Sequence, residues 1–169
     1  RANLTFSTYY AWGTDDHNQI AASPPGVESD IRAYFFAVEP SIDFDWIRLR
    51  GSILYASGDS DPFDNKSEGY AAIFENPQFA GGDTSYWIRQ GIPLIGGGGV
   101  ALTQRNGVLA DLRSSKEHGQ SNFNNPGLIL FGFGGDFDLL PELRMSFNLN
   151  RLMFDDTSNL EVLRNQGQL

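Results

Sequence analysis

Hydrophobic and polar residues alternate with a period of two along several parts of this 169-residue chain. The alternation is clearest in the stretches 2–12, 30–39, 45–57, 127–139 and 143–154. Successive side chains of a strand point to opposite faces of a sheet, so this period predicts β-strands with one apolar face. In the third stretch Ile47, Leu49 and Ile53 share one predicted face, whereas Arg48 and Arg50 share the other.

Connections of two kinds join these predicted strands. Short corners at 40–44 and 139–142 predict antiparallel hairpins, whereas long polar segments occupy 13–29 and 57–127. The latter segment far exceeds the 4 to 6 residues that are typical of connections in compact domains, so we expect it to carry structure or function of its own.

Within the long segment, the sequence predicts a helical turn near 68–76 and a hairpin built from 84–92 and 99–107. After the last strand, Ser158 and Glu161 have the spacing of a capping box, which predicts a short helix.

Composition narrows the function classes. Hydrophobic residues make up 40% of the chain, which excludes a disordered protein. A net charge of -9 disfavours nucleic acid as a partner, and the lack of cysteine excludes disulfides and thiolate metal sites. No stretch approaches the roughly 20 apolar residues of a spanning helix, but a barrel strand needs only about 10 alternating residues to cross a bilayer.

Two folds remain compatible with this pattern. In a soluble β-sandwich the apolar positions would fill a shared core, and aromatic residues at the strand ends would cover its rim. In a transmembrane barrel they would face lipid, short turns would alternate with long loops, and the aromatic residues would form interfacial girdles. Glycines at 132, 134 and 135 suit a curved barrel wall, so we expect an all-β, antiparallel, up-and-down transmembrane β-barrel.

Several stretches also carry a family resemblance. They are "DWIRLRGSILYASGDSDPFD", "IFENPQFAGG", "SYWIRQGIPL", "LRSSKEHGQSNFNNPGL" and "DFDLLPELRMSFNLNRLMFDDT". Together they resemble outer-membrane β-barrel proteins of the alginate-export type, which are porin-like proteins of Gram-negative bacteria. The resemblance implies a location in the cell outer membrane and a large monomeric barrel, whose lumen arginines attract an acidic polysaccharide or other anions.

The chain departs from that pattern in its strand number. It has five or six predicted strands, fewer than the eight that form the smallest such barrels. We therefore expect residues 1–169 to be a single segment of a larger barrel, with 57–127 inserted between barrel strands as an external or lumen-facing loop.

Candidate functional residues follow from the expected faces. The face opposite the apolar one is predicted to line the lumen with Arg32, Arg48, Arg50, Arg144, Asp136, Asp138, Asn148 and Asn150. The arginines have two interpretations: an anion-conducting ladder, or a structural network of salt bridges to Asp136 and Asp138 across neighbouring strands. Arg151 falls in the apolar register near a strand end, where its side chain can reach the membrane interface.

The loop "GDSDPFDNKSEG" raises the question of calcium. Asp59, Asp61, Asp64 and Asn65 offer hard oxygen ligands, but Tyr70 stands where an EF-hand requires glutamate. Ordinary solvated loop charge is the simpler interpretation, and we expect no other cofactor. The glycines at 96–99 lack the Lys-Ser or Lys-Thr of a phosphate-binding loop, and His118 near Ser114 has no orienting third group, so we do not expect an enzyme.

Three function hypotheses follow. The first is a porin-like channel or export conduit for anionic or sugar-like solutes. The second is a structural or scaffold barrel that sheathes or anchors a protein partner through residues 57–127. The third is a soluble β-sandwich that binds carbohydrate. The first two imply outer-membrane lipid as a partner.

Overall fold

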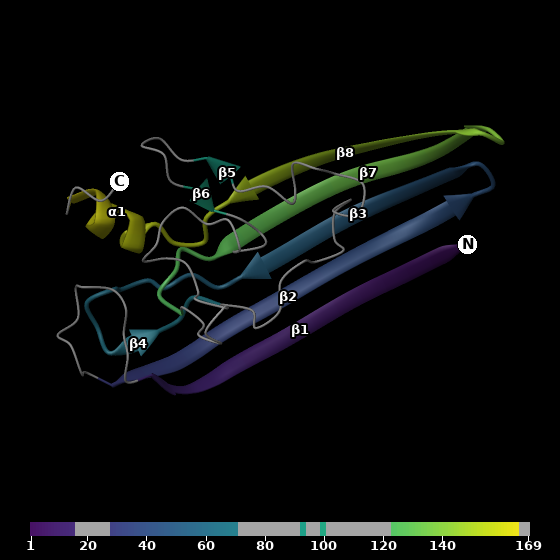
Figure 1. The fold of residues 1–169 in the computed structure, drawn as a ribbon. Helices are drawn as coiled ribbons and strands as arrows, with labels where there is room; N and C mark the ends of the chain where they lie inside the picture. Colours follow the sequence, from purple (N-terminus) through teal and green to yellow (C-terminus); the bar gives the residue numbers. More distant parts are fainter. Residues whose placement is uncertain (16–27, 71–91, 94–98, 101–122, 166–169) are drawn as a thin grey trace.

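The computed structural model describes residues 1–15, 28–70, 92–93, 99–100 and 123–165, and most of them belong to one sheet (Figure 1). Its strands are β1 (Ala2–Asp15), β2 (Ser29–Phe44), β3 (Ile47–Ala56), β4 (Lys66–Ser67), β7 (Leu128–Leu140) and β8 (Leu143–Met153). A separate pair joins β5 (Ile92–Pro93) to β6 (Gly99–Val100), and α1 (Ser158–Asn165) follows β8. No helix in these described ranges is long and apolar enough to cross a membrane.

The sheet confirms the predicted all-β, antiparallel architecture. Its order is β1-β2-β3-β7-β8, with every neighbouring pair antiparallel. The two-residue strand β4 adds a parallel pairing to the start of β2, beyond the end of β3. The described strands do not close into a barrel, so β1 and β8 form two edges.

The first hairpin turn differs from the prediction, which placed it at 40–44. Strand β2 continues through Pro40 to Phe44, and the turn consists of Asp45 and Trp46. Because proline has no N–H to donate, Pro40 falls in a gap of the β2–β3 ladder without ending the strand. Asp45 adopts a φ of 47°, a left-handed conformation that aspartate tolerates in tight turns.

The second hairpin turns where the sequence predicted. Pro141 and Glu142 connect β7 to β8, and the ladder has an irregularity between Asp138 and Leu140. Both hairpin turns lie at one end of the sheet, and β4 and α1 lie at the other (Figure 1). The connections between successive long strands therefore alternate between long and short, as predicted.

The end opposite the hairpin turns carries a structure that we call the cap, formed by residues 57–70, 123–127 and 154–165. Backbone hydrogen bonds join its segments: Asp59 N donates to Asn125 O at 2.8 Å, and Asp155 N donates to Pro126 O at 3.1 Å. A small core lies beside it, made of Ala37, Leu54, Ala56, Leu128 and Leu130, with Phe35, Tyr70 and Leu152 packed against them.

The helix α1 forms as predicted, but its start is stabilised differently. Asp156 Oδ1 accepts the Ser158 N–H at 2.7 Å, so Asp156 supplies the first side-chain acceptor instead of Ser158. The predicted helical turn at 68–76 and the hairpin at 84–92 and 99–107 lie mostly outside the described residues. Of that predicted hairpin, the structure describes only the paired residues of β5 and β6.

Candidate functional site

One face of the sheet collects large apolar side chains from all five long strands. Their register places on this face Leu4, Phe6, Tyr10, Trp12, Tyr34, Phe36, Val38, Ile42, Phe44, Ile47, Leu49, Ile53, Tyr55, Ile129, Phe131, Phe133, Phe137, Met145, Phe147, Leu149 and Met153. We call this set the apolar face. Most of its members are exposed, up to 73% for Leu149 and 76% for Trp12.

Aromatic clusters mark both ends of the strands. Near the cap, the Tyr10 ring lies 5.7 Å from the Trp12 ring and 4.7 Å from the Tyr34 ring. Near the hairpin turns, the rings of Trp46 and Phe137 are 6.3 Å apart. The apolar face is thus bordered by Tyr and Trp side chains, which have a polar atom on an apolar ring.

The opposite face is polar in the half next to the hairpin turns. Its central group is Arg50, whose Nη1 lies 2.7 Å from Asp136 Oδ2 and whose Nη2 donates to Asn148 Oδ1 at 3.1 Å. The Arg50 and Asp136 side chains are only 12% and 14% exposed. One guanidinium therefore bridges three strands, β3, β7 and β8, in a largely desolvated position.

Further polar pairs flank this group. Arg48 Nε lies 2.6 Å from Asp43 Oδ1, and Arg144 Nε lies 2.6 Å from Asp138 Oδ1. Beside them, the Ser52 hydroxyl donates to Glu39 Oε2 at 2.8 Å. We call the whole set the polar ladder: Glu39, Asp43, Arg48, Arg50, Ser52, Asp136, Asp138, Arg144 and Asn148.

The polar ladder has three arginines and four carboxylates, so it carries no excess positive charge. Each arginine has a carboxylate partner. Arg50 and Arg144 form the predicted ion pairs with Asp136 and Asp138, whereas Arg48 pairs with Asp43 instead. Asn150 extends this face toward the cap, opposite Gly132.

Arg32 does not belong to this face, and that prediction is wrong. Its register partner is Trp12, and two residues later Tyr34 pairs with Tyr10 on the apolar face. Arg32 therefore lies at the cap end of the apolar face, where its guanidinium is 3.6 Å from Asp30. Arg151 does lie in the apolar register, opposite Phe131, as predicted.

Two adjacent glycines, Gly134 and Gly135, leave space for side chains of neighbouring strands, one on each face of the sheet. A Cβ on Gly134 would lie 2.5 Å from Asn148 Oδ1 and 3.3 Å from Arg50 Nη2. A Cβ on Gly135 would lie 2.7 Å from Phe147 Cε1 on the apolar face. The glycines thus leave room for the Asn148 amide and the Phe147 ring to lie over β7, whereas the sequence predicted a role in wall curvature.

The cap contains a buried carboxylate, Asp59, which is 1% exposed. Its Oδ1 accepts the Glu68 N–H and its Oδ2 accepts an N–H from Asn159 Nδ2, both at 3.3 Å. Burial raises the pKa of Asp59 to about 6, and these two hydrogen bonds offset part of that effect. Asn159 is 0% exposed, and its Oδ1 has no hydrogen-bond partner among the residues that the structure describes.

The four candidate calcium ligands do not form a metal site. Asp61 Oδ1 accepts the Phe63 N–H at 3.0 Å, and Asp64 Oδ1 accepts the Lys66 N–H at 2.8 Å, so these carboxylates stabilise local turns. Asp59 is used inside the cap, and Asn65 is an exposed residue whose carbonyl accepts the Asp30 N–H. The described ranges contain no cluster of acidic or histidine side chains suited to a metal ion.

The candidate residues predicted from the sequence do not include Glu39, Asp43, Ser52 or Asn159. The predicted strand ends at Glu39, the predicted turn contains Asp43, and Asn159 falls in the predicted short helix. The alternation of Ser41 and Asp43 with Ile42 and Phe44 was the signal for the first two. Ser114, His118 and the glycines at 96–98 lie outside the described residues.

No family model, curated protein or solved structure matches this chain.

Proposed function

We propose that the five long strands form part of the wall of a porin-like β-barrel in the outer membrane. The apolar face meets lipid, and the polar ladder faces the lumen. The observation that carries this proposal is the apolar face, where about twenty large apolar side chains gather on one side of the sheet and mostly stay exposed. Soluble monomers rarely expose a contiguous apolar patch beyond a few hundred Å².

The dimensions of the apolar face fit a bilayer. From Tyr34 to Phe44 there are about ten residue steps, or about 34 Å at about 3.4 Å per step. A strand tilt of about 40° reduces this to about 26 Å along the membrane normal, against an apolar band of about 25 Å. The clusters around Tyr10 and Trp46 then fall near the two interfaces, where Tyr and Trp are enriched.

The two sheet edges support a larger barrel. In hydrocarbon, every backbone N–H and C=O needs a partner, so an open edge is costly. The outer edges of β1 and β8 have no neighbouring strand in the part of the chain that the structure describes. Further strands must cover them in a membrane, which makes these five a segment of the complete wall.

The polar ladder favours sugar-like solutes over anions. Its arginines are neutralised by carboxylates, so the surface lacks the unpaired positive charge that attracts anions. Ser52 and Asn148 add hydroxyl and amide groups of the kind that hydrogen-bond to uncharged polar solutes.

One observation favours a scaffold barrel as a second candidate. The core around Leu54 and Leu130 lies on the same face as the polar ladder, in the half next to the cap, and Tyr70 packs against it. In a barrel this end of the lumen would be filled by side chains. A filled lumen suits a barrel that anchors a partner better than an open conduit.

Site-directed spin labelling tests the orientation of the two faces. The chain has no cysteine, so single cysteines can be introduced at 145–150 in β8 without other changes. In liposomes, labels at Met145, Phe147 and Leu149 should be accessible to oxygen, which concentrates in lipid. Labels at Ser146, Asn148 and Asn150 should be accessible to a water-soluble nickel complex. Water accessibility at all six positions would contradict the proposal.

Two further measurements separate the candidates. A chain that stays monodisperse in buffer without detergent would contradict both barrel functions and leave the soluble β-sandwich. Planar-bilayer recordings of the complete barrel then divide conduit from scaffold, because only a conduit gives single-channel currents. For an ion-paired lumen, the double change Asp43→Asn and Asp136→Asn should shift selectivity toward anions by freeing two arginines.

A further inference from the structure

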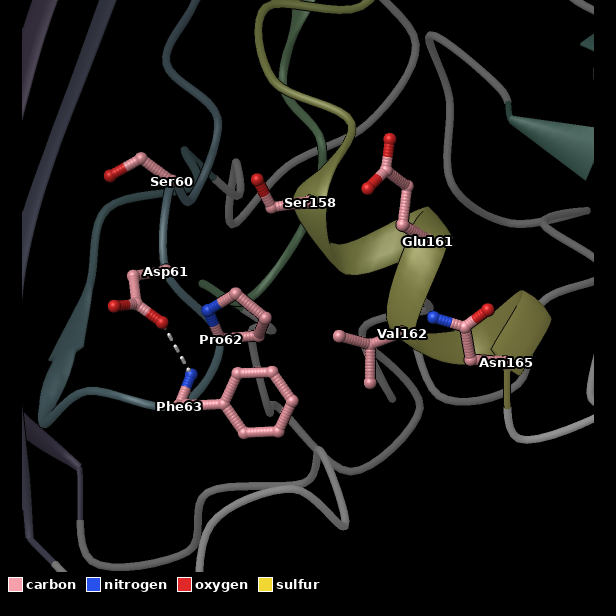
Figure 2. Close-up of a pocket in the computed structure, with 8 residues that line it drawn as sticks. All are labelled: Ser60, Asp61, Pro62, Phe63, Ser158, Glu161, Val162 and Asn165. Atoms are coloured by element: carbon pink, nitrogen blue, oxygen red, sulfur yellow. Dashed lines mark hydrogen bonds between the residues drawn. The ribbon is translucent and has the colours of Figure 1, made fainter.

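A cleft lies in the cap, between the loop that follows β3 and the helix α1 (Figure 2). Its volume is about 450 Å³, within the usual range of about 300 to 1,000 Å³ for small-molecule sites. One wall is the loop of Ser60, Asp61, Pro62 and Phe63, and the other is formed by Ser158, Glu161, Val162 and Asn165. The helix residues are spaced by three, one and three positions, which places them on one face of α1.

Phe63 is the main apolar surface of this cleft. Its side chain is 65% exposed, and it belongs to the cap, so the proposed lipid contact does not explain it. Figure 2 shows the ring turned toward Val162 on the opposite wall. The Phe63 N–H donates to Asp61 Oδ1 at 3.0 Å, which fixes the turn that presents the ring. An exposed aromatic ring in a concave site offers a flat surface for a ligand.

Polar groups around the ring mostly accept hydrogen bonds. Asp61 contributes a carboxylate from the loop, and Glu161 and Asn165 contribute a carboxylate and an amide from the helix. Carboxylates form strong charge-assisted hydrogen bonds with hydroxyl donors. The eight lining residues include two acidic side chains and no Lys, Arg or His, so the cleft disfavours anions.

The two walls are joined beneath the cleft. Asp59 immediately precedes the loop wall, and Asn159 lies between Ser158 and Glu161 on the helix. Their side chains hydrogen-bond at 3.3 Å, and Asp155 Oδ2 accepts the Gly58 N–H at 2.8 Å. These hydrogen bonds hold the walls in place before a ligand arrives, which lowers the entropic cost of binding.

We propose that the cleft between Phe63 and α1 binds a neutral sugar unit, with the apolar C–H face of a pyranose on the Phe63 ring and its hydroxyls hydrogen-bonded to Asp61 and Glu161. The aromatic ring with its surrounding acceptors carries this assignment. It does not depend on the membrane function, because every residue involved belongs to the cap. The same acidic groups exclude uronic acids, whose carboxylates they repel.

Calorimetric titration of the full chain in detergent micelles tests this assignment. The probes are maltotriose, cellotriose, mannotriose and chitotriose, with trigalacturonate as the acidic counterpart and butylamine as a cationic one. At least one neutral trisaccharide should bind at concentrations on the order of 10 mM, with little dependence on salt, whereas trigalacturonate should not bind. Binding by none of the neutral sugars, or by butylamine alone, would overturn the proposal.

Matched variants locate the site. Phe63→Leu keeps an apolar side chain but removes the ring face, and it should weaken sugar binding at least about tenfold. Asn65→Ala changes an exposed side chain of the same loop that does not line the cleft, so its affinity should match that of the native chain. Because Phe63 is exposed, its replacement should leave thermal unfolding unchanged. Equal binding by Phe63→Leu and Asn65→Ala would place the sugar elsewhere and overturn the proposal.

Discussion

Arg50 and Asp136, 86 positions apart in the chain, form a 2.7 Å ion pair that joins β3 to β7 on the polar face. Both side chains are largely shielded from water, so the loss of one partner leaves the other charge desolvated without compensation. We expect Asp136→Ala to lower the free energy of unfolding by about 2 to 4 kcal/mol, measured by urea titration in detergent micelles.

The pair Arg144–Asp138 provides the matched control. It has the same chemistry and a 2.6 Å contact, but its side chains are 66% and 51% exposed. Water screens such pairs, so Asp138→Ala should lower the free energy of unfolding far less than Asp136→Ala does. Equal losses for the two variants would mean that burial of the Arg50 pair contributes nothing.

Gly134 should tolerate no larger residue. In Gly134→Ala the new Cβ would lie 2.5 Å from Asn148 Oδ1 and 3.2 Å from the Phe147 carbonyl oxygen, which is backbone and cannot rotate away. We expect a loss of about 1 to 3 kcal/mol in the free energy of unfolding. Gly51→Ala is the control, because its nearest contact, Pro40 Cγ, lies at an ordinary 3.7 Å. A Gly134→Ala protein as stable as Gly51→Ala would show that β7 and β8 separate without cost.

Much of the sheet could be predicted because the two faces of most strands differ sharply in polarity. In β8, Met145, Phe147 and Leu149 alternate with polar residues, so a period of two fixes the register. The start of β2 lacks this signal. Ala37 belongs to the small core beside the cap and Phe35 packs against it, while Tyr34 and Phe36 belong to the apolar face. Because both faces of β2 are apolar here, the local sequence does not indicate on which face Arg32 lies.

The cap could not be predicted in the same way. Asp59 and Asn159 are 100 positions apart, and each stands in a polar stretch where solvent exposure is the ordinary expectation. Their contact depends on the crossing of three separate segments at the end of the sheet. Similarly, Pro40 resembled a strand end, but the gap it leaves in one ladder is tolerated because β2 also pairs with β1.

The cap should be more stable in mild acid than at neutral pH, because protonation of Asp59 removes the cost of a buried carboxylate. Its pKa is raised to about 6 in the folded protein from 3.8, so the folded state favours the protonated carboxyl. The cost of the buried carboxylate is absent below about pH 4, develops as pH rises, and is complete above about pH 7. We therefore expect amide hydrogens of α1 to become better protected as pH falls from 7.5 to 5, by a factor corresponding to about 1 to 2 kcal/mol.

The variant Asp59→Asn isolates this effect. It keeps the shape of the side chain and cannot titrate, so protection of α1, corrected for intrinsic exchange, should become independent of pH over the same range. Asp61→Asn is the control, because Asp61 is exposed in the neighbouring turn and its replacement should leave the native pH dependence in place. A native chain whose α1 loses protection between pH 7.5 and 5 would contradict the assignment to Asp59.

A charged substitution at Leu149 tests whether the apolar face contacts lipid or water. The side chain is 73% exposed in the sheet, so in a soluble protein Leu149→Arg would replace a surface residue and change stability by no more than about 0.5 kcal/mol. In a bilayer the same arginine would enter hydrocarbon and cost about 2 to 4 kcal/mol near the midplane. We expect the larger loss, measured by reversible unfolding from lipid vesicles.

Ser146→Arg, on the opposite face of the same strand, should cost less than about 1 kcal/mol because its side chain meets water in the lumen. Equal small effects for both variants would mean that water bathes both faces, and the barrel would have to be abandoned.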